Sequence, residues 1–471
     1  MNYKKFHKFF YAALLAASLS SCGFFNTEDV VDPNSPSLSG TTKNPTADQV
    51  EQLAYGALSA TRGWVGGAAV GTAPAGAATG MYRYVQIAGV FGREIYVLAS
   101  NDDRWYTDLY GVKGGALDNN NFLSLDYYNG YAQARRAAQA LLEGAENSTY
   151  LTETQKAGAK GVANTLKAYS MLMLLNMQYK QGIRIEVDKD VLKPGPFVSY
   201  EQGMAEIKRL LDEGATQLAS GAFPTATFVP ASVLPGIVTG TTVTPADFRK
   251  VNRALAARVA VYSSDWTGAL TALQGSFLNL TGSLNAGWMA TFAGSPDVFN
   301  PFFQAVNSTQ AQLALVHPSY LKDIEAGDKR AEKVRKRTSA VSKGGLASDI
   351  EPAIYANNTA SFPLINNEEL VLIYAEANIQ SGNLAEGTKA LNIIRTTYGL
   401  KEYAGADNKD ALINEMLHQR RYSLFYLGHR WIDMRRYGRL NQLPLDLPTH
   451  KVFEQHVRPF AEDAWDQANG G

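Results

Sequence analysis

The clearest hydrophobic pattern in the chain lies between Asn366 and Gly438. Apolar residues recur there at the three- and four-residue spacing of a helix with one buried face. They fall into three successive groups: Leu370, Ile373, Tyr374 and Ala377; Leu384, Leu391 and Ile394; and Ile413, Met416, Leu417, Leu424 and Leu427. Glycines follow the groups at Gly382, Gly399 and Gly428, where glycine commonly caps a helix. The pattern predicts two helices joined by a tight turn, then a third helix that reaches residue 427.

The same spacing predicts further helices over 46–62, from residue 131, and over 153–179, 200–218 and 248–275. A repeat without gaps supports the pairing of helices, because residues 257–273 align with residues 375–391. The matched positions are Ser263 with Ser381, Asp265 with Asn383, Trp266 with Leu384, Ala272 with Ala390 and Leu273 with Leu391. Such pairs bury their apolar faces only by stacking on neighbours. We therefore predict a mostly α fold, a tetratricopeptide-like superhelix of about four helix pairs that carries an irregular, loop-rich inserted subdomain.

The segments between the helix pairs define the expected divisions of the chain. Residues 46–276 form an N-terminal region that contains aromatic-rich loops over 63–130, and eleven aromatic residues lie between Tyr82 and Tyr131. Residues 277–471 form a C-terminal region, with a loop-rich insertion at 277–365, helices at 366–438 and an extended tail. The charge run Asp328–Arg337 is expected to be a solvated face.

The first 21 residues read as an export signal, with Lys4, Lys5 and Lys8 ahead of a short apolar stretch. The sequence Leu19-Ser20-Ser21-Cys22 has the form of a lipobox, and Cys22 is the single cysteine of the chain. We expect lipidation at Cys22, with residues 22–45 as a tether or strap. An ordinary signal peptide beside an unrelated cysteine is the alternative.

Charge and motif searches exclude several classes of function. Without the signal the chain has 41 basic and 44 acidic residues, too little positive charge for a nucleic-acid partner. The chain has no G-x-S-x-G, no G-x-G-x-x-G and no phosphate-binding loop. Its six histidines form no H-E-x-x-H, and with one cysteine expected to carry lipid we predict no metal, no cofactor and no catalytic residue.

The C-terminal motifs resemble those of the SusD/RagB family. The matching residues are Ala375-Glu376-Ala377, Ser381-Gly382-Asn383, Leu391-Asn392, Ile394-Arg395 and Gly399-Leu400, then Gln419-Arg420-Arg421, Ser423-Leu424, Gly428, Arg430-Trp431, Asp433-Met434, Arg436 and Gly438. The family usually has carboxylates at three positions where this chain has Gln419, Ser423 and Leu427. We expect the arginines of this region to pair internally, with acids such as Glu415 and Asp433, rather than to form an anion-binding patch.

The resemblance implies a surface lipoprotein of the outer membrane that captures a nutrient, an oligo- or polysaccharide or a peptide. It also implies delivery of that ligand to a SusC-like TonB-dependent transporter. Family members place their glycan platform in loops of the N-terminal region and of the later insertion, so the resemblance points to the loops near residue 100 and near Trp288.

Residues 100–110 contain both kinds of side chain that a sugar requires, because flat aromatic rings stack on its C–H face and polar groups bond its hydroxyls. The candidate ligand-binding residues are Asn101, Asp102, Asp103, Arg104, Trp105, Tyr106, Tyr110 and Trp288. An alternative left open is that Trp105 and Tyr110 only pack the irregular subdomain. Two further functions remain: a tetratricopeptide-type protein-binding adaptor, and a glycoside hydrolase that uses Asp102, Asp103 or Asp108.

Overall fold

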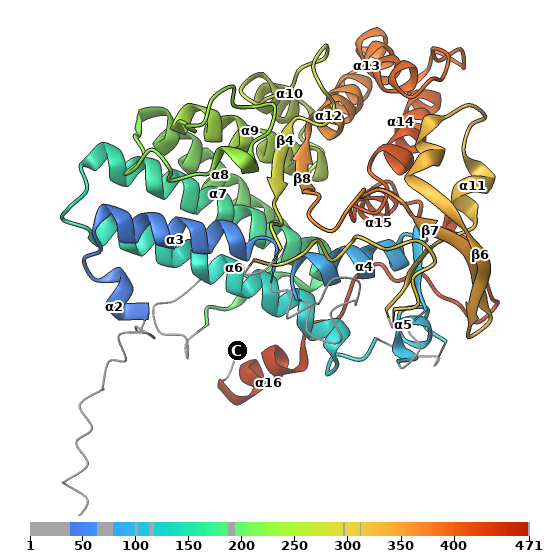
Figure 1. Ribbon diagram of the computed structural model, residues 1–471, viewed down its shortest axis with the longest axis horizontal. Helices are drawn as coiled ribbons and strands as arrows, with labels where there is room; N and C mark the ends of the chain where they lie inside the picture. The colour runs from blue at the N-terminus through green and yellow to red at the C-terminus, as the bar shows by residue number, and fades with distance from the viewer. Residues whose placement is uncertain are drawn as a thin grey trace, which may run out of the picture.

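The computed structural model describes residues 38–63, 79–98, 102–112, 117–186, 194–294, 297–310 and 312–469. Helices form the body of this part of the chain (Figure 1). They are α2 (Leu38–Thr42), α3 (Ala47–Ala60), α4 (Met81–Phe91), α5 (Arg104–Thr107), α6 (Phe122–Asn147), α7 (Glu153–Gln178), α8 (Tyr200–Ser220), α9 (Pro245–Tyr262), α10 (Trp266–Gln274), α11 (Ser319–Asp323), α12 (Asn367–Gln380), α13 (Leu384–Thr397), α14 (Lys409–Ser423), α15 (Arg430–Arg436) and α16 (Phe460–Asn469).

The strands of the described chain are short and form two-stranded antiparallel sheets. The pairs are β1 (Ile95–Val97) with β5 (Ala314–Val316), β2 (Ile183–Arg184) with β3 (Phe197–Val198), β4 (Gly287–Ala290) with β8 (Phe362–Asn366), and β6 (Val334–Lys343) with β7 (Leu346–Pro352). The two longest strands, β6 and β7, form a hairpin at one side of the molecule (Figure 1).

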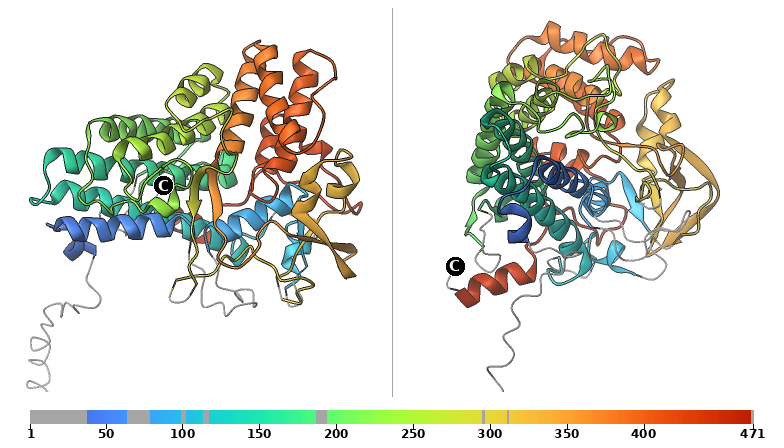
Figure 2. Two further views of the ribbon diagram at one scale, coloured as in Figure 1. Left: turned by 45° about the horizontal axis from the view of Figure 1, so that its top comes forward. Right: turned by 60° about the vertical axis from the view of Figure 1, so that its left-hand side comes forward.

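Most of the helices pack in chain order as one curved layer (Figures 1 and 2). α3 packs on α6, α6 on α7, α7 on α8, α8 on α9 and α9 on α10; α10 then meets α12, which packs on α13 and α14. The contact between α10 and α12 places the two repeated helix pairs side by side. The predicted mostly helical fold of tetratricopeptide-like pairs is confirmed.

Capping side chains set where the long helices begin. In five helices the N-cap side chain accepts the amide of the third helical residue, whose side chain in turn accepts the cap's own amide. These caps are Thr46, Asn121, Thr152, Ser199 and Thr244. Each reciprocal pair satisfies two amides that the first helical turn leaves without partners. The predicted starts of α3, α7 and α8 agree with these caps.

The internal repeat appears in the structure as two turns with the same hydrogen bonds. Between α9 and α10, the Asp265 amide donates to the Ala260 carbonyl at 2.8 Å; between α12 and α13, the Asn383 amide donates to the Asn378 carbonyl at 2.8 Å. The residue before each amide has left-handed backbone, with φ +57° at Ser264 and +87° at Gly382. The sequence repeat is therefore a repeat of backbone geometry.

Two of the C-terminal arginines, Arg420 and Arg436, pair with buried acids, as predicted, whereas Arg435 bonds the Glu454 carbonyl and lies over aromatic rings. Arg420 bonds Asp433 at 2.7 Å, with both side chains buried, and Arg436 bonds Asp433 at 2.9 Å and also bonds Glu376. At Gln419, where the family usually has a carboxylate, the amide oxygen accepts from Arg330 at 2.6 Å. An amide thus replaces the usual acid as the partner of a buried guanidinium. The prediction for Glu415 was wrong in its partner, because Glu415 bonds Arg395 on α13 rather than an arginine of the group.

Three local predictions were wrong. The third C-terminal helix ends at Ser423 rather than residue 427, since the backbone turns to positive φ at Tyr426; Lys333 satisfies the carbonyls of Tyr422 and Ser423, at 2.9 and 2.7 Å. The charge run 328–337 is not a solvated face, since the Asp328–Arg330 pair is fully buried. Within the aromatic-rich segment 63–130, α4 is a helix with every residue buried, and α6 starts at residue 122 rather than 131.

The segment after α15 runs back over the body before it reaches α16. The His456 amide donates to the Met177 carbonyl of α7 at 2.8 Å, and the Trp431 ring nitrogen donates to the Phe453 carbonyl at 2.8 Å. Among the described helices, none combines the length and the apolar character that crossing a membrane requires.

Candidate ligand-binding surface

The predicted binding segment lies between the helical body and the β6–β7 hairpin (Figure 1). It follows β1, whose Ile95 faces Val316 of β5 in the sheet register. Lys343, at the end of β6, forms an ion pair with Asp103 at 2.8 Å. The fold thus joins residues 102–110 to a hairpin far along the chain. Asn101 lies outside the described residues.

Asp102 and Arg104 form one polar unit. The Asp102 carboxylate accepts the Arg104 backbone amide at 3.0 Å and its guanidinium at 2.9 and 2.6 Å. The guanidinium lies over the Phe122 ring at 4.7 Å, so it is held from two sides. Hydrogen bonds from Arg104 lower the pKa of Asp102, which therefore stays ionised and poorly suited to act as a general acid.

Tyr106 is the partly buried aromatic ring of this segment. Its ring lies against the turn of the hairpin, where a Cβ on Gly344 would come within 2.3 Å of the ring carbon Cδ2. Lys343 Nζ lies 5.7 Å from the ring centroid. Partial burial and a hydrogen bond with Asp103 raise the pKa of the Tyr106 hydroxyl. Ring, carboxylate and ammonium therefore form a small amphipathic surface.

Three rings named as ligand-binding candidates are core residues. Trp105, Tyr110 and Trp288 expose at most 1% of their surface. Trp105 packs on Phe122 at 5.8 Å, and Tyr110 packs on the His450 ring at 4.6 Å. Because a ring must present a face to stack on a sugar, the packing alternative describes Trp105 and Tyr110, and we extend it to Trp288.

Trp288 lies in β4, beside the helix pairs and apart from α5 (Figure 1). Its ring makes edge contacts with Tyr169 of α7 at 5.1 Å and Phe248 of α9 at 6.4 Å. It also lines a cavity of about 340 Å³ together with Arg62 and Asp297. The structure therefore does not bring Trp288 together with Asp102–Tyr106.

Lys343 and Gly344 belong to the surface but were missed in the sequence. The consecutive glycines at 344 and 345 were an available signal, because a Gly-Gly pair between β-forming residues marks a tight hairpin turn. Their positive φ angles, +61° and +82°, fit that turn. Nothing local in the sequence indicates that the turn packs against Tyr106.

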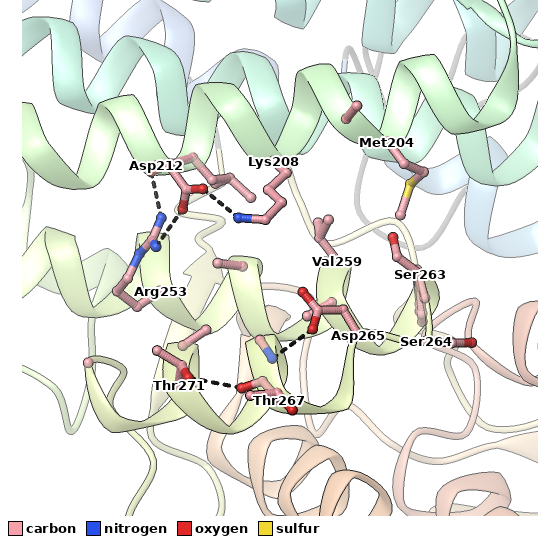
Figure 3. Close-up of a pocket in the computed structure, with 18 of the residues that line it drawn as sticks. Met204, Lys208, Asp212, Arg253, Val259, Ser263, Ser264, Asp265, Thr267 and Thr271 are labelled. Atoms are coloured by element: carbon pink, nitrogen blue, oxygen red, sulfur yellow. Dashed lines mark hydrogen bonds and ion pairs between the residues drawn. The ribbon is translucent and has the colours of Figure 1, made fainter. Parts of the chain in front are cut away.

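A large groove lies elsewhere, over α9 between α8 and α10 (Figure 3). Its volume is about 940 Å³, within the range of ligand sites. Figure 3 shows Met204 and Val259 toward one end and Asp212 between Lys208 and Arg253 toward the other. Asp212 bonds Lys208 at 2.6 Å and Arg253 at 2.9 Å. This groove suits the adaptor alternative.

Comparison with known proteins confirms the resemblance drawn from the C-terminal motifs. Residues 333–469 match the model of the SusD family. Among curated proteins, no sequence relative matches the chain. Over residues 333–469 the chain is therefore similar to the SusD family, and solved structures extend the likeness to the fold of the rest.

A SusD superfamily protein from Bacteroides vulgatus has a TM-score of 0.63 at 16% identity and covers 89% of this chain and 97% of its own. Surface glycan-binding protein A from Bacteroides thetaiotaomicron has a TM-score of 0.67 at 11% identity, over 91% of this chain and 98% of its own. The same protein in complex with laminarihexaose has a TM-score of 0.66 at 11% identity, over 90% and 98%. At such identities the comparison shows a shared SusD-like fold.

Proposed function

We propose that this protein is a cell-surface glycan-binding lipoprotein that passes its ligand to a SusC-like TonB-dependent transporter without changing it. The match of residues 333–469 to the SusD family and the SusD-like fold support the class. The laminarihexaose complex of a structural neighbour supports a glycan as the ligand. The lipobox at Cys22 supports attachment to the outer membrane, although Cys22 lies outside the described residues.

The observation that carries the ligand site is the surface formed by Asp102, Asp103, Arg104 and Tyr106 with Lys343. A pyranose has one face of C–H groups and a rim of hydroxyls. The Tyr106 ring supplies a flat apolar contact, and the ion pairs on either side supply acceptors and donors. Because Gly344 supports the ring from behind, Tyr106 is held in place before a ligand arrives.

The test is binding of purified protein to a panel of polysaccharides and peptides, before and after Tyr106→Ala. Loss of one stacked ring is expected to weaken binding by about 1 kcal/mol, a factor of roughly five. Tyr150→Ala is the matched control, because Tyr150 is 63% exposed at the turn before α7. Equal loss with both variants, or none with Tyr106→Ala, would refute this site.

The groove between α8 and α10 supports a second candidate function, capture of a peptide segment of a protein partner. Binding of peptides but no polysaccharide, weakened by Met204→Glu and unaffected by Tyr106→Ala, would favour it. The hydrolase alternative has less support, because two of its three candidate carboxylates are paired with cations, Asp102 with Arg104 and Asp103 with Lys343. Release of a cleavage product from any polysaccharide or peptide of the panel would favour the hydrolase.

A further inference from the structure

The helix α16 lies on the outside of the body (Figures 1 and 2). None of its residues is buried, and Phe460 is 51% exposed. The helix meets the body through the carboxylates of Glu462, Asp463 and Asp466, and through the Trp465 ring, whose centroid lies 5.3 Å from the guanidinium carbon of Arg184. Because no residue of α16 is fully buried, its docking depends chiefly on these contacts with arginines.

These carboxylates meet two arginines that stack on one aromatic ring. Arg184 of β2 is 2% exposed and bonds Glu462 at 2.7 Å and Asp466 at 2.7 Å. Arg458 bonds Asp463 at 3.3 Å. The two guanidinium carbons lie 4.2 and 3.6 Å from the centroid of the Phe197 ring. Planar guanidinium groups held in this way match carboxylate and sulfate geometry.

Each arginine also bonds the body apart from α16. Arg184 donates to the Gly195 carbonyl at 2.6 Å, and Arg458 donates to the Gln181 carbonyl at 2.7 Å. Arg135 of α6 donates to the Arg184 carbonyl, and its Nε has no hydrogen-bond partner within the described chain. If α16 moved away, three neighbouring guanidinium groups would be open to another anion.

We propose that Arg135, Arg184 and Arg458 form a binding site for the carboxylate or sulfate groups of an acidic glycan, and that α16 covers this site with its own carboxylates. The ligand and the helix then compete for the same guanidinium groups. The inference rests on the proposed function in one respect, that the anion belongs to a glycan. The site is distinct from the surface around Tyr106.

The first test measures binding of a uronate hexasaccharide, a neutral hexasaccharide and inorganic sulfate by calorimetry at low ionic strength. Neutralising α16 should uncover the site and raise the affinity for the uronate about tenfold or more, since the competent state becomes more populated. The uncovering variant combines Glu462→Gln, Asp463→Asn and Asp466→Asn. The matched control removes three carboxylates from α8 by Glu201→Gln, Glu206→Gln and Glu213→Gln, and should leave the affinity unchanged.

Adding Arg184→Gln to the uncovering variant should remove the gain. An equal gain in the α8 control, or no gain on uncovering, would overturn the proposal, and equal binding of sulfate and uronate would overturn the glycan assignment. Binding of the neutral hexasaccharide, measured in the same samples, reports on the Tyr106 surface. Absence of neutral hexasaccharide binding would count against the proposed function. The uronate measurements would still decide whether the arginine site exists.

A second test needs no substitution and so does not depend on a variant folding. Amide hydrogen exchange of residues 460–469 in the natural protein should become faster when the uronate is added, because the ligand displaces the helix. Exchange should also rise with salt, which screens the ion pairs. Unchanged protection of α16 at saturating uronate would overturn the proposal.

Discussion

Breaking the buried ion pair between Arg258 and Glu369 should lower the free energy of unfolding more than breaking the surface pair between Glu206 and Arg209. Arg258 of α9 bonds both carboxylate oxygens of Glu369 of α12, each at 2.6 Å, and the Leu364 carbonyl at 2.7 Å. Both side chains are 2% exposed. Replacing either residue with methionine leaves an unpaired buried charge, which costs about 3–5 kcal/mol. The double replacement should cost several kcal/mol less than the sum of the two.

The assay is guanidinium chloride unfolding of the wild type, both single variants and the double variant, followed by circular dichroism. Glu206→Gln provides the comparison, since its bond to Arg209 lies at the surface and should contribute at most about 1 kcal/mol. The reasoning would be refuted if either single variant lost less than about 1 kcal/mol of unfolding free energy. It would also be refuted if the loss in the double variant equalled the sum of the losses in the two single variants.

Three further predictions concern the turn, the pH dependence and the anchor. Gly382→Ser should cost about 1 kcal/mol, because it imposes positive φ on a side chain; nothing lies within 4 Å of the added Cβ, and unchanged thermal unfolding would contradict this. Burial lowers the pKa of His456 from 6.5 to about 4. Between these two pH values the unfolded chain binds a proton at His456 and the folded chain does not, so stability falls as the pH falls. From pH 7 to 5 the wild type should therefore lose about 2 kcal/mol more unfolding free energy than His456→Gln, and equal losses would contradict it. Cys22→Ala should move the protein out of the membrane fraction, and unchanged fractionation would argue against the anchor.

The helical scaffold was predictable because its signals are local. Capping residues such as Thr152 and Ser199 lie beside the helices that they start. The repeated turn needs only residues close in sequence, so Ser263–Asp265 and Ser381–Asn383 could be aligned before their hydrogen bonds were known. Stacking of the pairs then follows from the apolar faces that single pairs leave uncovered.

The candidate site was predictable only in part, because exposure depends on distant packing. Trp105 and Tyr106 are neighbours in one short helix, but Trp105 points under Arg83 while Tyr106 meets the hairpin turn at Gly344. No sequence period distinguishes the two over a single turn. The sequence therefore named Trp105, Tyr106 and Tyr110 together as candidates, and could not tell the two core rings from Tyr106.

The exposure of the charged run 328–337 was predicted wrongly because it, too, depends on packing with residues far along the chain. The run from Asp328 to Arg337 has the composition of a solvated face, yet Arg330 is buried against Asp328 and Gln419. Lys333 donates to the last two carbonyls of α14, and that helix stops before Gly428. Both outcomes require the insertion to pack on α14, and sequence spacing gives no account of that contact.

The most direct test of the central claim is affinity electrophoresis of the purified protein through gels that contain single polysaccharides, beside Tyr106→Ala and Tyr150→Ala. Our account predicts that at least one polysaccharide retards the wild type and Tyr150→Ala, that Tyr106→Ala migrates faster in that gel, and that the polysaccharide is recovered intact. Migration unaffected by every polysaccharide, or retardation that Tyr106→Ala leaves unchanged, would contradict it.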